Sequence, residues 1–301
     1  MRLIVRGKQV VGLLVVAFAI MIVPRTSETA EATSLEVLRR VIDALAGRRV
    51  GWLEDLPAGM ETRATSSLRE LFRSTVRAVP IVLAQDGDGS GVVIDVNQAE
   101  SAAWVVTSGH VVEKPFRTDK GTPFVWLLFY ERELASEEFE RQRLTRCVKS
   151  DEETTWCRAF QRSIRRGIVV GVDPGRDLAL LWVSNVPPDI KGIPGINVGA
   201  VEAGDDVAVI GHPRGFLWSL TTGIVSAVRD KYPMGSARGT VIQTQAPINP
   251  GNSGGPLLTL EGRLLGVITW VVAGAEGLNA AVGIDEVQTF VFRQATRFGK
   301  R

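Results

Sequence analysis

The feature that most constrains the fold of this chain is a serine set among glycines, in the run INPGNSGGPL at residues 248–257. A serine hydroxyl is a weak nucleophile until a base lies within hydrogen-bond distance and amide donors face the charge that develops during attack. Glycines around Ser253 allow a tight turn, in which a substrate carbonyl could approach the N–H groups of Gly251 and Ser253. Because glycine, asparagine and proline also form ordinary turns, the run predicts catalysis only together with a histidine and an aspartate.

The search for a base has two answers, because the chain contains only 2 histidines in 301 residues. His110 follows an apolar run in the segment WVVTSGHVV (104–112), which places its imidazole at the end of a strand. His212 lies between an apolar segment and a Pro-Arg-Gly turn, and we interpret it as a turn residue. His110 precedes both candidate aspartates and Ser253, which gives the order His, Asp, Ser of one known triad arrangement. We therefore predict His110 as the base.

The acidic partner has to accept a hydrogen bond from the imidazole and fix its tautomer, which favours a carboxylate at the start of an apolar strand. Asp177 opens such a run, DLALLWV, at residues 177–183. Asp173 is the alternative, but in the sequence VDPGR an aspartate before Pro-Gly has a sufficient explanation in the turn itself. We therefore predict Asp177 as the partner of His110.

Six blocks of sequence, in the same order, resemble the HtrA (DegP/DegS-like) branch of the chymotrypsin-fold serine proteases. The resemblance covers about residues 67 to 297, and its blocks are GSGVVID (89–95), TSGHVV (107–112), DLALL (177–181), TTGIVSAV (221–228), IQTQAPINPGNSGGPLL (242–258) and GRLLGVIT (262–269). It implies an all-β fold, a chymotrypsin-like double six-stranded β-barrel with an N-terminal helical segment and a C-terminal helix. It also implies His110 as base, Asp177 as its orienter and Ser253 as nucleophile. The amides of Gly251 and Ser253 match the oxyanion hole, and Thr269 matches the residue that helps to hold the aspartate.

The same resemblance implies a serine endopeptidase that hydrolyses peptide bonds of proteins, unfolded ones included, through an acyl-enzyme and without cofactor or metal. The alternative is a protease-fold binding or chaperone module with a latent triad, because HtrA relatives switch between misaligned and aligned loops. An esterase with the same triad is a third interpretation, although α/β-hydrolases carry their serine before the acid and the histidine. Members of this family usually carry PDZ domains after the protease, and we predict none before Arg301.

The loosest part of the alignment concerns the specificity pocket. Pro247 stands where a trypsin-like pocket would have an aspartate, so a basic P1 side chain would find no counter-charge. Thr269, Trp270 and Val271 resemble the Ser-Trp-Gly wall of chymotrypsin-like proteases, but Val271 replaces the glycine that keeps a deep pocket open. With Leu278 on the opposite wall, we expect a shallow apolar pocket. The alternative is that Val271 and Leu278 pack inside the second barrel.

The first 32 residues predict an export element, because Arg2, Arg6 and Lys8 precede the apolar run VVGLLVVAFAIMIV at 10–23. The run is shorter than the roughly 20 residues of a spanning helix, and a small-residue cleavage site, AEA at 30–32, follows only after a polar gap. The segment is therefore either a cleaved signal peptide or a signal anchor in the membrane. In both cases we expect the protease domain outside the cytoplasm, as a periplasmic, secreted or membrane-anchored protein.

Residues 33–78 predict two helical pieces ahead of a protease domain at 79–301. An apolar stripe at helical spacing runs along the first piece and consists of Leu35, Leu38, Val41 and Leu45. The stripe either packs against the barrel or forms a stalk or a homo-oligomer contact, since HtrA-like proteases trimerise through N-terminal segments.

A segment dense in both charge signs, from Glu131 to Arg166, predicts a solvated insertion with some helix. It contains both cysteines, Cys147 and Cys157, and an exported compartment favours a disulfide between them. Their spacing lacks the C-x-x-C form of zinc and redox sites, so we predict no metal site. The formal net charge of +2 and the lack of a basic patch interleaved with aromatic residues argue against nucleic acid as a partner.

Overall fold

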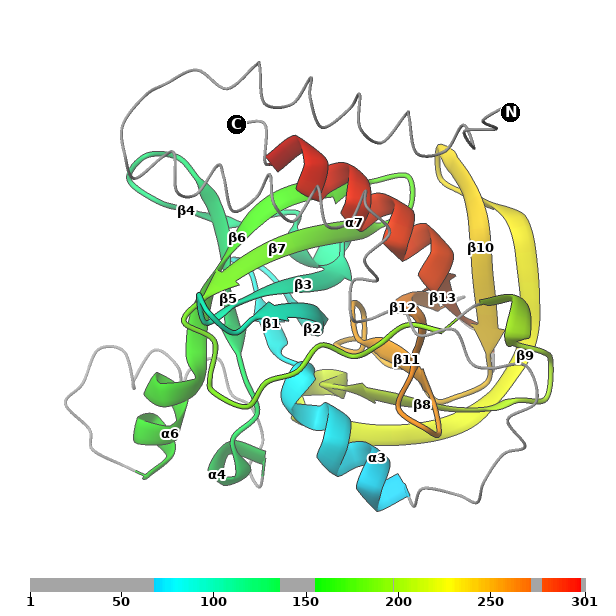
Figure 1. Cartoon of the computed structure of the whole chain (residues 1–301), viewed down its shortest axis with the longest axis horizontal. Helices are drawn as coiled ribbons and strands as arrows, with labels where there is room; N and C mark the ends of the chain where they lie inside the picture. Colours follow the sequence, from blue (N-terminus) through cyan, green and yellow to red (C-terminus); the bar gives the residue numbers. More distant parts are fainter. Residues whose placement is uncertain (1–67, 136–154, 197, 272–277, 299–301) are drawn as a thin grey trace, which may run out of the picture. The chain divides into compact units, whose positions relative to one another are not determined.

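The computed structural model describes residues 68–135, 155–196, 198–271 and 278–298 (Figure 1). The chain divides into two compact units, residues 51–291 and residues 1–50 with 292–301. Every strand given below belongs to the first unit, whereas the second contributes only residues 292–298 to the described part. The predicted export element, the apolar stripe and Cys147 lie outside the described residues. Among the helices that the structure describes, none combines the length and the apolarity that a membrane span requires.

The first barrel is an antiparallel sheet closed on itself. Its strands are β1 (Ile81–Leu83), β2 (Asp88–Asn97), β3 (Ala102–Ser108), β4 (Phe116–Arg117), β5 (Pro123–Leu128), β6 (Ile164–Asp173) and β7 (Leu178–Ser184). They pair in the order β1-β2-β3-β7-β6-β5-β4, and β1 also pairs with β5, so six strands close the barrel while β4 extends β5. Strand β3, with the sequence AAWVVTS, is buried along its whole length, as its apolar and β-branched residues favour.

The second barrel is also closed and antiparallel. Its strands are β8 (Asp206–Gly211), β9 (Ser219–Met234), β10 (Ala237–Thr244), β11 (Pro256–Thr259), β12 (Leu264–Val271) and β13 (Asn279–Gly283), in the order β10-β13-β12-β11-β8-β9. Aliphatic side chains fill its interior, among them Val207, Val209, Ile242, Leu257 and Ile268. The double six-stranded barrel expected from the sequence is therefore confirmed.

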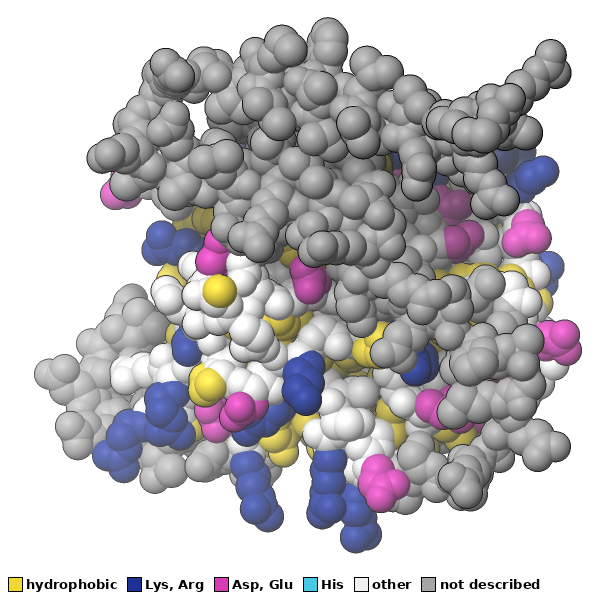
Figure 2. Space-filling view, in the orientation of Figure 1, with side chains coloured by type: hydrophobic (Ala, Val, Ile, Leu, Met, Phe, Trp, Pro, Cys, Tyr) yellow, Lys and Arg dark blue, Asp and Glu magenta, His cyan; other side chains and the backbone are white. Residues whose placement is uncertain are grey.

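Short helices accompany the barrels. They are α3 (Leu68–Thr75), α4 (Arg132–Ala135), α6 (Thr155–Ser163) and α7 (Ile284–Phe298), with 3₁₀ turns η1 (Val76–Ala78), η2 (His110–Val112), η3 (Val198–Ala200) and η4 (Pro213–Gly215). Residues of η1, α4 and α6 bury apolar side chains in one cluster, including Val76, Leu134 and Phe160. Exposed arginines lie on α3, α4 and α6, and basic side chains gather over these helices in Figure 2. Of the two expected N-terminal helical pieces, the second is present as α3, and the first lies outside the described residues. The expected C-terminal helix and helix within the charged insertion are present too.

The predicted disulfide remains untested, because Cys147 lies outside the described residues and only the backbone of Cys157, in α6, is described. We expect mass spectrometry of the non-reduced, exported protein to recover one linked peptide pair. Closing so short a loop contributes about 2–3 kcal/mol in the chain-entropy account. The double variant Cys147→Ser/Cys157→Ser should therefore unfold at a lower temperature and keep its activity. Two free thiols in the exported protein would contradict the pairing.

Candidate active site

His110 and Asp177 lie at neighbouring strand ends of the first barrel. His110 begins η2, with one residue between it and the end of β3, and Asp177 directly precedes β7, the antiparallel partner of β3. Nδ1 of His110 lies 2.7 Å from Oδ2 of Asp177, and the backbone N–H of His110 donates to Oδ1 over 2.8 Å. The carboxylate therefore contacts both the ring and the backbone of His110, an arrangement that fixes the orientation of the imidazole.

Further donors hold Asp177 in place. Its backbone φ of 55° lies in the left-handed region, which costs a non-glycine residue about 1–2 kcal/mol. Its carbonyl accepts the N–H of Gly109 over 2.9 Å. The hydroxyl of Thr269, a buried residue of β12, donates to Oδ2 over 2.5 Å. Because β12 belongs to the second barrel, the aspartate is held from both barrels.

These contacts move the pKa values of the two groups apart. Burial raises the pKa of Asp177, but the hydrogen bonds from His110 and Thr269 and the charge of His110 outweigh it, so the pKa is lowered. The hydrogen bond to Asp177 raises the pKa of His110 against the opposing effect of burial. Asp177 therefore stays ionised at neutral pH, while His110 binds a proton more readily than an ordinary histidine, as a general base requires.

Ser253 lies half-buried in the loop between β10 and β11, and this loop has a backbone that only glycine fits. Gly251 has a φ of 102° and Gly254 a φ of 84°. A Cβ at Gly251 would overlap the carbonyl of His212, and a Cβ at Gly254 would overlap the hydroxyl of Thr107. The loop thus combines left-handed conformations with close approach to neighbouring segments, which excludes larger residues.

Hydrogen bonds fasten the Ser253 loop to the first barrel. The backbone N–H of Ser90, in β2, donates to the carbonyl of Ser253 over 2.8 Å. The carbonyl of Ile268, in β12, accepts the N–H of Gly254 over 2.7 Å and the hydroxyl of Ser108, in β3, over 2.9 Å. The loop of Ser253 and the end of β3, which leads to His110, are therefore joined through the carbonyl of Ile268.

The sequence assigns two N–H groups, those of Gly251 and Ser253, to an oxyanion hole. Within the described ranges, the N–H groups of Gly251 and Ser253 donate to no backbone carbonyl. In the same residues, no hydrogen bond joins the hydroxyl of Ser253 to His110. In unliganded proteases this bond is often long and shortens when substrate binds.

The residues assigned to the specificity pocket are only partly described. Pro247 is exposed, and Leu278, which directly precedes β13, is 40% exposed. The side-chain amide of Asn279 donates to the carbonyl of Ala246 over 2.8 Å, which brings Leu278 and Pro247 to the same end of β10 and β13. Two of the predicted wall residues have side chains outside the described part, Trp270 and Val271. The depth of the pocket therefore stays a prediction.

His212, the second histidine, is fully buried. Its Nδ1 accepts the backbone N–H of Trp218 over 3.1 Å, and burial lowers its pKa to about 3. It stays neutral and out of contact with solvent, so it cannot act as a base toward a substrate. His212 does precede the η4 turn, as the sequence indicated, but its burial was missed, and the apolar residues on both sides of HPRG were the available signal. In this turn the N–H of Arg214 donates to the carbonyl of Pro250 over 2.8 Å, which supports the Ser253 loop.

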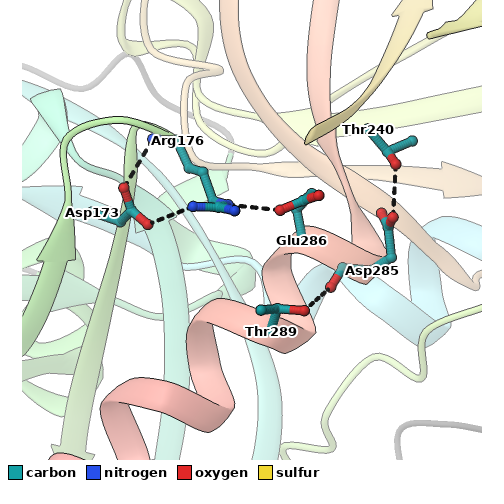
Figure 3. A network of polar contacts seen from close by, with 6 residues as sticks. All are labelled: Asp173, Arg176, Thr240, Asp285, Glu286 and Thr289. Carbon is teal, nitrogen blue, oxygen red and sulfur yellow. Dashed lines mark hydrogen bonds and ion pairs between the residues drawn. The ribbon is translucent and has the colours of Figure 1, made fainter. Parts of the chain in front are cut away.

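Asp173, the alternative aspartate, closes the turn to which the sequence assigned it. Its Oδ1 accepts the backbone N–H of Arg176 over 3.0 Å (Figure 3). No group of three or more His, Cys, Asp and Glu side chains is placed to hold a metal ion in the part of the chain that the structure describes.

Residues 89–267 match the family model described as Trypsin-like peptidase domain. A probable periplasmic serine endoprotease, DegP-like, from Pseudomonas fluorescens is 37% identical over 144 residues, which are 46% of this chain and 29% of the relative. Protease Do-like 5, chloroplastic, from Arabidopsis thaliana is 31% identical over 209 residues, 67% of this chain and 55% of the relative. The chain thus spans less than two thirds of the length of these relatives.

Among solved structures, the serine endoprotease from Yersinia pestis superposes with a TM-score of 0.54 at 22% identity. The superposition covers 78% of this chain and 68% of that protein. At this identity the likeness shows a shared fold, the chymotrypsin-like double barrel.

Proposed function

Because the chain belongs to the trypsin-like peptidase domain family, we propose that it is a serine endopeptidase that cleaves proteins. The observation that carries the proposal is the chain of hydrogen bonds from Thr269 through Asp177 to His110, beside the loop of Ser253. The DegP-like and Do-like relatives are proteases too, which supports the same reaction class.

In this mechanism Ser253 Oγ attacks the carbonyl carbon of the scissile bond, and Nε2 of His110 takes the hydroxyl proton. The carbonyl oxygen becomes an oxyanion, which accepts hydrogen bonds from the N–H groups of Gly251 and Ser253. When the C–N bond breaks, His110 gives its proton to the leaving amine, and the acyl group stays on Ser253. A water molecule then repeats both proton transfers with His110 and releases the acid. Asp177 remains ionised throughout and stabilises the imidazolium.

Covalent labelling tests whether the site is competent. A fluorophosphonate probe should modify the wild-type chain, with Ser253 as the modified residue, and should leave Ser253→Ala unlabelled. Degradation of unfolded casein, compared with hydrolysis of a simple ester, then separates a protease from an esterase. Labelling of Ser253→Ala to the wild-type extent would contradict the assignment of the nucleophile.

The second candidate function is a binding or chaperone module with a latent triad. It is favoured by the absence of a hydrogen bond between Ser253 and His110 among the described residues. A chain of this kind would resist the fluorophosphonate and leave casein intact, yet would suppress aggregation of an unfolded protein. The same assays therefore distinguish the two candidates.

We propose that the protein acts outside the cytoplasm, where the export element of residues 1–32 would place it. The names of the relatives place them in the periplasm and the chloroplast, which agrees with this location only by distant similarity. Protection of the chain from added protease in intact cells, and its loss when the outer compartment is opened, would test the location.

The predicted P1 preference is for small aliphatic side chains such as Val, Ala and Thr. Pro247 supplies no charge for a basic side chain, and Val271 replaces the glycine that would keep a pocket of this kind deep. Each misfit methylene should cost about 1–3 kcal/mol, roughly 10- to 200-fold in kcat/KM. Profiling cleavage sites on a peptide library measures this preference. Val271→Gly should admit Phe, and a dominant wild-type preference for Arg, Lys or Phe would contradict the pocket.

A further inference from the structure

The turn that leads to Asp177 contains an arginine, Arg176, which binds carboxylates on both of its sides. The turn runs from β6 to β7 through residues 174–177. Asp173, the last residue of β6, binds this turn (Figure 3). Oδ1 of Asp173 accepts the backbone N–H of Arg176 over 3.0 Å, and Oδ2 accepts its guanidinium over 3.2 Å. The next residue is Asp177, with its left-handed backbone. Contacts that fix Arg176 therefore also restrict the backbone that leads into Asp177.

The guanidinium of Arg176 also binds helix α7, which follows the last strand of the second barrel. Its Nε donates to Oε2 of Glu286, in the first turn of α7, over 2.7 Å. Figure 3 shows the guanidinium between the carboxylates of Asp173 and Glu286. The side chains of Arg176 and Glu286 are only 15% and 17% exposed. A charge-assisted bond so shielded from water is stronger than an exposed ion pair.

Two glycines lie so close to this ion pair and its turn that a larger residue would overlap neighbouring atoms. A Cβ at Gly239, in β10, would overlap the carboxyl group of Glu286. A Cβ at Gly175 would lie 2.9 Å from the hydroxyl of Ser236 and 3.1 Å from Cβ of Ala237, at the hairpin of β9 and β10. The turn before Asp177 is thus packed against the second barrel as well as ion-paired to α7.

We infer that Arg176 and Glu286 are positioning residues, which hold the turn of Asp177 against the second barrel so that the aspartate meets His110 in the orientation that catalysis needs. This inference rests on the proposed function. His110 and Asp177 come from the first barrel, whereas Ser253 comes from the second. Thr269 holds the carboxylate of Asp177 directly, and Arg176 holds its backbone from the preceding residue.

Kinetics of three variants test the pair. We expect Arg176→Met and Glu286→Gln each to lower kcat about tenfold with KM nearly unchanged, because substrate contacts are retained while the base is misaligned. The double variant should be no slower than the slower single variant, since both remove the same contact. Arg176→Lys, which keeps the charge but not the planar fork, should lie between wild type and Arg176→Met. The matched control is Lys114→Gln, which removes an exposed ion pair with Asp86 near His110 and should leave kcat within about twofold.

Two readouts separate positioning from a loss of stability. Because Asp177 raises the pKa of His110, a displaced aspartate should move the acid limb of the kcat/KM profile to lower pH. In addition, the low-field proton resonance of the Nδ1–H of His110 should broaden or move upfield. An unchanged acid limb and an unchanged resonance in Arg176→Met and Glu286→Gln would overturn the inference, whatever their unfolding temperatures.

The failure of this inference and that of the proposed function are distinguishable. Absence of fluorophosphonate labelling in the wild-type chain would contradict the proposed function alone. The resonance of His110 can still be recorded in that case, in the Ser253→Ala background. Its loss on adding Arg176→Met would support the positioning pair, and its persistence would overturn it.

Discussion

Ser253→Ala is expected to lower the turnover of a peptide substrate by about four to six orders of magnitude while the chain keeps its fold. The loop is held through backbone groups, the carbonyl of Ser253 and the N–H of Gly254, so loss of the hydroxyl removes no hydrogen bond that holds this loop among the described residues. His110→Ala should cost about as much, and Asp177→Asn about 10⁴-fold in kcat. Because the three residues act as a unit, a double variant should be little slower than the slower single one. Steady-state kinetics and thermal unfolding of each variant measure both effects.

The pH dependence checks the same assignment. His110 must be neutral to take the proton of Ser253, so kcat/KM should fall as the pH drops through its pKa. Since the bond to Asp177 raises that pKa, the fall should lie above the pH of about 6.5 expected for an ordinary histidine. Asp177→Asn removes the carboxylate, so the acid limb of its residual activity should shift to lower pH. Full proteolysis by Ser253→Ala would end the serine-protease interpretation.

Gly254→Ala is expected to damage both stability and activity severely, although it leaves every catalytic side chain in place. An alanine at this position meets a left-handed φ of 84° and overlaps the carbonyl of Ser90 and the hydroxyl of Thr107. Strain and overlap together should lower the free energy of unfolding by about 2–5 kcal/mol. Any displacement of the neighbouring Ser253 also costs activity, so kcat should fall at least 100-fold at a temperature where the variant is folded.

A second glycine provides the matched control. Gly121 has a similar left-handed φ of 80°, but a Cβ there meets no atom within 4 Å. Gly121→Ala should therefore show the backbone strain alone, about 1–2 kcal/mol, with unchanged kcat. Chemical denaturation and steady-state kinetics of both variants give the comparison. Equal losses of stability in the two variants would show that the close contacts of Gly254 contribute nothing.

The resemblance of six ordered sequence blocks implied the two barrels, whereas local patterns indicated single strands and the triad candidates. Strand β3 is an apolar, β-branched run that ends at the sequence before His110, so its burial follows from composition and periodicity. The choice between Asp177 and Asp173 rested on turn chemistry, and the structure places Asp173 on the backbone of Arg176 within that turn. Each of these features depends on residues a few positions apart, which a single sequence displays.

The remaining features depend on contacts between distant residues. The burial of His212 results from packing against Trp218 and the segment at Val79, which also accepts the indole N–H of Trp218. Arg176 and Glu286 are 110 positions apart, and nothing in the sequence around either one marks a partner. Arginine and glutamate are abundant on any protein surface, so an ion pair of this kind becomes visible only when the topology brings the two chain segments together.

The carbonyl oxygen of Ile268 affects how the site tolerates amino-acid substitution. It accepts hydrogen bonds from two donors, Ser108 and Gly254. Ser108 lies two residues before His110, and Gly254 directly follows Ser253. Ile268 itself directly precedes Thr269, which binds Asp177. A main-chain atom is the same for every amino acid, so a volume-conserving exchange of the Ile268 side chain would leave this oxygen in place. A slip of β12 by one residue would instead carry it away from both donors and turn Thr269 from Asp177. The alignment of the site is therefore encoded in the register of a strand rather than in the identity of the residue at its centre.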